Sequence, residues 1–175
     1  MSAHAPSTTV LVGNPRPSSR TSLAALSAAR AATRVAGGGP EPHVIELADL
    51  APRLFPGDDP AVAEAVRRVT ETDLLVVASP TYKATYTGLL KAFLDRIDTG
   101  ALARVVALPL MVVGSPVHAL AVEVHLRPLL VELGATVVTP GLAVAEGDLR
   151  RIDELTAAWA GRLGRWLGPR REPVA

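Results

Sequence analysis

One apolar run constrains the fold of this chain more than any other feature. The run LLVVA at residues 74–78 carries no charge and lies between Asp73 and Ser79. A segment that is apolar at both odd and even positions predicts a strand covered on both faces, as in the centre of a parallel sheet. Since parallel strands are joined by crossovers that are usually helical, the run indicates an α/β fold.

The rest of the chain alternates apolar runs with helical patterns, without internal repeats or a long linker. The predicted strands are Thr9–Val12, His43–Leu47, Asp73–Ser79, Val105–Val113 and Thr136–Thr139, the last with a continuation at Leu142–Val144. The predicted helices are Ser22–Val35, Ala61–Thr70, Gly88–Ile97, Pro116–Leu133 and Leu149–Leu167. This order predicts one three-layer α/β domain over residues 1–175, with loose tails at 1–8 and 169–175.

Proline and glycine set the expected breaks. Residues 48–60 are expected to form a loop because they carry Pro52, Pro56, Gly57 and Pro60. Pro109 removes a donor from its strand, so a bulge or an early break is expected there. Pro128 is expected to kink its helix or to start a fresh turn. Trp159 and Trp166 are two turns apart and are expected on one helix face, in the core or a subunit contact.

The loop after the first strand has the chemistry of an anion site. Residues 9–22, TVLVGNPRPSSRTS, lead from a buried strand into a helix. The first amides of a helix lack backbone partners, and the helix dipole favours negative charge there. Serine and threonine hydroxyls and two arginines add further donors. The residues predict a site for a terminal phosphate, and they leave open a loop whose Ser or Thr only caps the helix.

Two better-known phosphate loops are excluded. GxxxxGK[ST] and GxGxxG are both absent, so hydroxyls rather than glycines form the cradle. This favours a flavin mononucleotide, FMN, over ATP or a tightly held dinucleotide. The residues predicted to hold or flank the phosphate are Asn14, Arg16, Ser19, Arg20 and Thr21.

Two further loops are expected beside the first, because ligands of such sheets bind beyond the carboxyl ends of the strands. After the central strand, a stiff Pro80 and the flat face of Tyr82 suit a planar ring. The alternative is an ordinary loop with an exposed tyrosine. The residues predicted around the ring are Pro80, Thr81, Tyr82 and Lys83, with Gly114 and Ser115 at its far edge. His118, near the start of the next helix, is interpreted as a surface residue rather than a ligand contact.

Composition excludes several classes of function. The net charge of +1 implies neither nucleic acid nor a membrane surface as a partner. The absence of Cys excludes disulfides, thiolate metal sites and thiol catalysis. No run is long enough to span a bilayer and no signal peptide is recognisable, so a cytoplasmic location is expected. No catalytic triad, paired carboxylates or metal-ligand set is evident, which fits hydride transfer by a flavin without a catalytic side chain.

The three loops together resemble the NADPH-dependent FMN reductase family of the flavodoxin-like superfamily. The first family motif, GSxRxxS, corresponds to GNPRPSS at residues 13–19, and the second, P-x-Y, to Pro80–Tyr82. The runs YTGLLK at 86–91, VHALAV at 117–122 and LRPLL at 126–130 look like the alkanesulfonate-type FMN reductases. The resemblance covers roughly Thr9 to Val144. Asn14 replaces the usual serine, and Val124-His125 stands where some of these enzymes carry an aromatic residue in an interrupted helix.

The resemblance implies a flavodoxin-like sandwich with a five-stranded parallel sheet of order 2-1-3-4-5. It also implies hydride transfer from NADPH or NADH to FMN, with reduced flavin supplied to a flavin-dependent monooxygenase. One alternative is a quinone, azo-dye or chromate reductase of the same family, with FMN permanently bound. Alternatives of other classes are a flavodoxin-like electron carrier, which is usually acidic, and a non-catalytic flavodoxin-fold module.

A homodimer or homotetramer is expected from the resemblance and from the third and fourth predicted helices. These two helices carry more apolar side chains than a single buried face on each could hold. The side chains are Leu89, Leu90, Phe93, Leu94, Leu120, Val124 and Leu129. The exposed remainder would favour association between copies.

Overall fold

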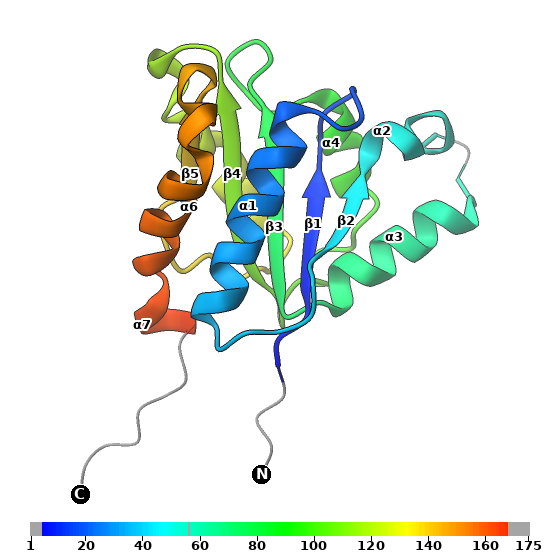
Figure 1. Ribbon diagram of the computed structural model, residues 1–175. Coiled ribbons are helices and arrows are strands. Elements are labelled where there is room, and N and C mark those ends of the chain that lie inside the picture. Colours follow the sequence, from blue (N-terminus) through cyan, green and yellow to red (C-terminus); the bar gives the residue numbers. More distant parts are fainter. Residues whose placement is uncertain (1–4, 56, 168–175) are drawn as a thin grey trace, which may run out of the picture.

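A computed structural model describes residues 5–55 and 57–167 and contains one parallel sheet (Figure 1). Its strands are β1 (Thr8–Val12), β2 (His43–Glu46), β3 (Leu74–Pro80), β4 (Val106–Val113) and β5 (Leu142–Ala145). Their order across the sheet is β2-β1-β3-β4-β5. The expected order is therefore confirmed, with the apolar run at 74–78 in the central strand.

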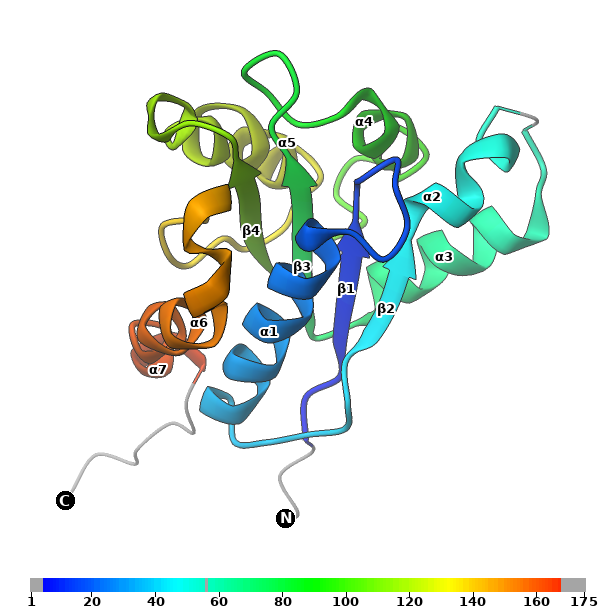
Figure 2. The same cartoon turned by 45° about the horizontal axis from the view of Figure 1, so that its top comes forward.

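Helices cover both faces of the sheet (Figures 1 and 2). One face carries α1 (Arg20–Val35), α6 (Ile152–Gly161) and α7 (Gly164–Leu167), which pack on even-numbered residues of β1 and β3. The other carries α2 (Leu47–Leu50), α3 (Pro60–Glu71), α4 (Gly88–Leu94) and α5 (Arg127–Glu132). Helix α1 turns a row of alanines to the sheet, and they are fully buried: Ala25, Ala28, Ala29 and Ala32.

The prediction of a bulge or break at Pro109 is wrong, because β4 runs without interruption and Pro109 pairs in register with Val77. The nitrogen atoms of β4 point alternately to its two neighbours. Val106 donates to Asp73 on the β3 side, and Ala107 donates to Thr136 on the other. The nitrogen of Pro109 therefore points to the β5 side of β4. On that side, β4 pairs with β5 only from Leu110 onward. The missing N–H falls in a gap of the ladder, so proline costs the sheet no hydrogen bond.

The fifth strand lies later in the chain than predicted. In place of a strand over Thr136–Thr139, Thr136 makes a single bridge to Val106, and β5 begins at Leu142 in the predicted continuation. Arg127 explains the difference, because its guanidinium donates to the carbonyl oxygens of Val137 and Thr139. These carbonyl oxygens therefore accept from a side chain rather than from a neighbouring strand.

The predicted helix over 116–133 is three pieces. A 3₁₀ turn at Pro116–His118 and a π-helical turn at Val122–Leu126 precede α5. Pro128 lies in the first turn of α5, so it starts a fresh helical turn, which is one of the two expected outcomes. Glu123 pairs with Arg127 and accepts from the amide of Gly141, which ties the π-helical turn to the start of β5.

Two other segments also differ from prediction. Residues 48–60 are not all loop, because α2 and a 3₁₀ turn at Ala51–Arg53 occupy the region where Leu47 and Leu54 anchor in the core. The last helix is broken into a 3₁₀ segment at Glu146–Arg151, α6 and α7, with glycine at 161 and 164. Glycine disfavours a helix interior, and the break separates the tryptophans. Trp159 is buried and donates to the Pro140 carbonyl, whereas Trp166 is exposed.

Smaller differences occur at element ends. Helix α1 begins at Arg20 rather than Ser22, and α4 ends at Leu94 rather than Ile97. Thr8, expected in a tail, is in β1, and both the amide and the hydroxyl of Ser7 donate to Asp73. The predicted tails at 1–4 and 169–175 lie outside the described residues. Within 5–55 and 57–167, none of the helices is long and apolar enough to cross a bilayer.

Candidate functional site

A hollow of about 460 Å³ lies at the carboxyl edge of the sheet, where the loops after β1 and β3 meet the end of β4. This volume is within the usual range for small-molecule sites. It is lined by Asn14, Arg16, Pro17, Ser18, Ser19, Arg20, Thr21, Pro80, Tyr82, Val112 and Glu146. All five residues predicted for the phosphate are among them, together with Pro80 and Tyr82.

The N-terminus of α1 opens into this hollow. Ser19 is the N-cap, and its Oγ accepts from the amide of Ser22 at 3.2 Å while its carbonyl accepts from Leu23 at 3.1 Å. The amides of Arg20 and Thr21 are the remaining donors of the first turn, which holds no acidic residue. A 16-residue helix thus presents amides, hydroxyls and a guanidinium at its positive end, as anion sites do.

Asn14 shapes this loop with both ends of its side chain. Its Oδ1 accepts from the amide of Arg16 at 2.9 Å, and its Nδ2 donates to Oγ1 of Thr21 at 3.1 Å. Since Thr21 accepts from Asn14, its own hydroxyl proton is left to donate into the hollow. Asn14 therefore acts chiefly on the loop and on Thr21, which is a more indirect role than sequence reasoning assigned to it.

The loop after β3 forms a tight hairpin that carries Tyr82. Tyr82 and Thr85 exchange backbone hydrogen bonds of 2.8 and 3.2 Å around Lys83 and Ala84. Lys83 and Ala84 both have positive φ, 52° and 68°, which is costly for residues other than glycine. Residues with strained backbone conformations are enriched at functional sites, where the surrounding structure holds them in place. The hairpin presents Tyr82, 45% exposed, beside the hollow.

Buried contacts hold the first two loops together. Thr87 caps α4 by accepting from the amide of Leu90, and its hydroxyl donates to the carbonyl of Gly13. The Oγ of Ser79 accepts from the amide of Thr87 at 3.0 Å. Gly13 has no room for a side chain, because a methyl group there would lie 2.6 Å from the Cβ of Leu90. Sequence reasoning missed these contacts, because in the sequence Thr87 looks like an ordinary loop residue.

Four predicted residues are near the hollow but do not line it: Thr81, Lys83, Gly114 and Ser115. Thr81 is tied to the end of β4 by its amide, which donates to Val112 at 2.9 Å. Its hydroxyl oxygen is buried and has no hydrogen-bond partner among the described residues. Lys83 is at the hairpin tip, while Gly114 and Ser115 follow β4 directly. Ser115 is the N-cap of the 3₁₀ turn that contains His118.

Glu146 is a lining residue that sequence reasoning did not identify. It follows β5, and its Oε2 lies 3.1 Å from Nη2 of Arg20. Ser18, one of the hydroxyl donors expected in the first loop, has a positive φ of 50°. The carboxyl end of the predicted continuation at Leu142–Val144 was a signal for Glu146 that sequence reasoning did not use.

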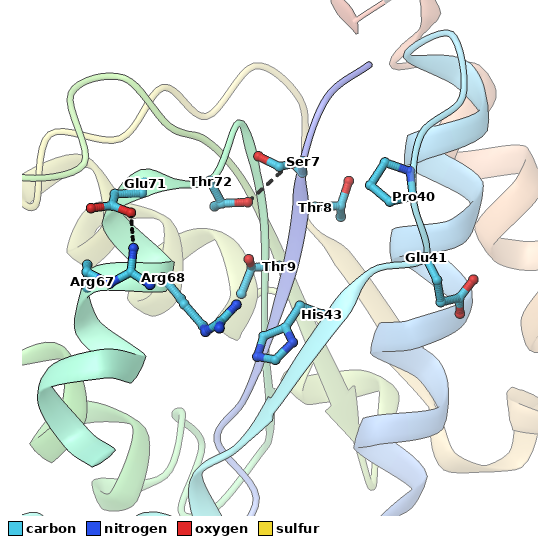
Figure 3. A pocket seen from close by; sticks show the side chains of 10 residues that line it. All are labelled: Ser7, Thr8, Thr9, Pro40, Glu41, His43, Arg67, Arg68, Glu71 and Thr72. Carbon is cyan, nitrogen blue, oxygen red and sulfur yellow. Dashed lines mark hydrogen bonds and ion pairs between the residues drawn. The ribbon is translucent and has the colours of Figure 1, made fainter. Parts of the chain in front are cut away.

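A second hollow, of about 240 Å³, lies at the opposite edge of the sheet, near the amino ends of β1 and β2 (Figure 3). Its arginines are already paired within α3, Arg67 with Glu64 and Glu71, and Arg68 with Glu64. Parallel α/β sheets bind ligands at their carboxyl edge. Its volume and its neutralised charges make this second hollow the weaker candidate.

A parallel sheet of order 2-1-3-4-5, with a loop rich in hydroxyl and amide donors between β1 and α1, is typical of the flavodoxin-like class of α/β proteins. Comparison with known proteins agrees. The chain belongs to the NADPH-dependent FMN reductase family, whose model matches residues 6–148.

Relatives and solved structures give the same picture. The chain is 38% identical over 113 residues to the NADH-dependent FMN reductase SfnF of Pseudomonas fluorescens, covering 62% of this chain and 60% of that protein. It is 34% identical over 128 residues to SfnE of Pseudomonas putida, covering 70% and 69%. The chain thus spans less than two thirds of the first relative. An apo NADH:FMN oxidoreductase structure matches with TM-score 0.77 and 33% identity, over 96% of this chain and 92% of that one. An oxidoreductase from Corynebacterium diphtheriae matches with TM-score 0.81 and 30% identity, over 93% and 97%.

Proposed function

We propose that this chain is an NAD(P)H-dependent FMN reductase. The observation that carries the proposal is the donor set at the start of α1: two amides, the hydroxyls of Ser19 and Thr21, and the guanidinium of Arg20 around one hollow. A terminal phosphate dianion matches that set in charge and in hydrogen bonding. FMN ends in such a phosphate, whereas riboflavin has none and the phosphates of FAD are internal.

The ring of FMN is proposed to lie between the hairpin after β3 and the end of β4. Pro80 and Tyr82 supply apolar and flat surface there, and Val112 closes the floor. The buried, unpartnered hydroxyl of Thr81 suits a polar edge of the ring. Lys83, Gly114 and Ser115 are proposed to contact the ring's periphery. When bound, FMN supplies the hydride-accepting chemistry, and these residues bind and orient it.

The experiment is steady-state NADPH and NADH oxidation by the purified chain, with and without added FMN. Oxidation that depends on added FMN supports the reductase. A coloured protein that needs no added FMN favours the quinone-type alternative, and FMN binding without NAD(P)H oxidation favours the electron carrier. Fluorescence titration should show that FMN binds far better than riboflavin, and equal affinity for the two would contradict the assignment of the first loop.

Association between copies is proposed from an apolar surface next to the site. Val117, Leu120, Val124 and Val131 are 79%, 71%, 56% and 54% exposed along residues 116–133. In contrast, Leu90, Phe93 and Leu94 of α4 are fully buried within the chain, so these three side chains are not available for association. A homodimer or homotetramer through 116–133 covers the surface. Light scattering that gives a monomer at micromolar concentration would contradict it.

A flavin-dependent monooxygenase is the proposed consumer of reduced FMN. The support is similarity to the NADH-dependent FMN reductases SfnE and SfnF. The test is coupled turnover, in which this chain replaces the cognate reductase of a two-component monooxygenase.

A further inference from the structure

We infer that Glu146 is a resident counter-anion at the phosphate site, which competes with FMN for Arg20 and keeps the flavin exchangeable. The inference deepens the proposed function and rests on it. It concerns whether FMN leaves after reduction or stays as a fixed prosthetic group.

Charge at the start of α1 is the first part of the argument. Arg20 is the first residue of α1, where a cation is unfavourable because the helix dipole is positive there. The first turn of α1 offers no carboxylate of its own. Glu146 supplies the missing negative charge from the end of β5, at 3.1 Å from the guanidinium. A bound phosphate would likewise supply negative charge beside Arg20 at the N-terminus of α1.

The two anions compete because they share one hollow. Arg20 and Glu146 both line it, together with the hydroxyl donors Ser19 and Thr21. Bound phosphate must either take Arg20 from Glu146 or share it, and in both cases a dianion lies near a carboxylate. The side chains of Arg20 and Glu146 are 65% and 46% exposed, so their ion pair is weak and opens easily. Glu146 therefore lowers the affinity for FMN without closing the site.

The test replaces the charge of Glu146 and nothing else. Glu146→Gln is compared with Asp148→Asn, which removes one negative charge from the same exposed 3₁₀ segment but outside the hollow. Fluorescence quenching gives the affinities for FMN and riboflavin, and stopped-flow displacement gives the dissociation rate of FMN. Glu146→Gln should tighten FMN by about fivefold to tenfold, the scale of an exposed ion pair acting on a dianion, and slow its release. Riboflavin affinity should not change.

The control and the wild type separate the outcomes. Asp148→Asn should alter FMN affinity by less than about twofold, since an exposed charge outside the hollow acts on the phosphate only through screening solvent. Unchanged or weaker FMN binding in Glu146→Gln would overturn this inference alone, as would equal tightening in Asp148→Asn. Failure of the wild-type chain to bind FMN at all would overturn the proposed function as well.

Discussion

Replacing Gly13 by alanine tests how closely the end of β1 is seated against α4. The added methyl group would lie 2.6 Å from the Cβ and 3.1 Å from the Cγ of Leu90. Carbon atoms in ordinary contact are about 3.5–4.0 Å apart, so the strand end and the helix must separate by about 1 Å. Leu90 is fully buried, and its Cβ cannot rotate out of the way. Overpacking of this kind costs about 1–3 kcal/mol of unfolding free energy.

Urea unfolding, followed by the fluorescence of buried Trp159, measures the effect. With a typical slope of about 2 kcal/mol per M, the midpoint should fall by about 0.5–1.5 M. Affinity for FMN should weaken too, because Gly13 positions Asn14 and accepts from Thr87. Gly161→Ala is the matched control, since a methyl group there meets nothing within 4 Å. A Gly13→Ala protein with the wild-type midpoint would refute the close packing of Gly13 against Leu90 of α4.

Three further predictions follow from single side chains. Thr81→Val removes a buried hydroxyl without a partner, so the urea midpoint should stay or rise, while FMN and riboflavin should both bind more weakly; unchanged binding of both would remove Thr81 from the ring site. Burial raises the pKa of Glu123, but hydrogen bonds from Arg127 and the Gly141 amide outweigh it and hold the pKa below its ordinary 4.5. That stabilisation is present above pH 4.5 and is lost as the pH falls through the lowered pKa, so unfolding free energy in Glu123→Gln should depend less on pH below about 5, and an unaltered pH profile would contradict this. His118→Ala and His125→Ala should each keep flavin reduction, measured by stopped flow at saturating FMN and NADPH, within about tenfold; a loss on the order of a thousandfold would reveal a proton donor.

Much of the site was predictable because its signals are local. A buried strand, a hydroxyl-rich loop and a helix start follow one another within residues 9–22, so a candidate anion site can be recognised without any distant contact. Residues 74–78 placed β3 in the centre of the sheet for a similar reason, since an uncharged run must be covered on both faces.

Other features were decided only by the tertiary structure, because they depend on contacts between residues far apart in the chain. Pro109 is tolerated because pairing on its β5 side resumes only at Leu110, and β5 begins late because Arg127 holds the preceding carbonyls. Glu146 reaches Arg20 only once β5 is placed at the edge of the sheet. The sequence by itself determined the strand–loop–helix units and their donors, because backbone propensity and burial act over a few neighbouring residues. Register, the breaks in helices and the charge opposite Arg20 arise from contacts between distant segments, which no local pattern records.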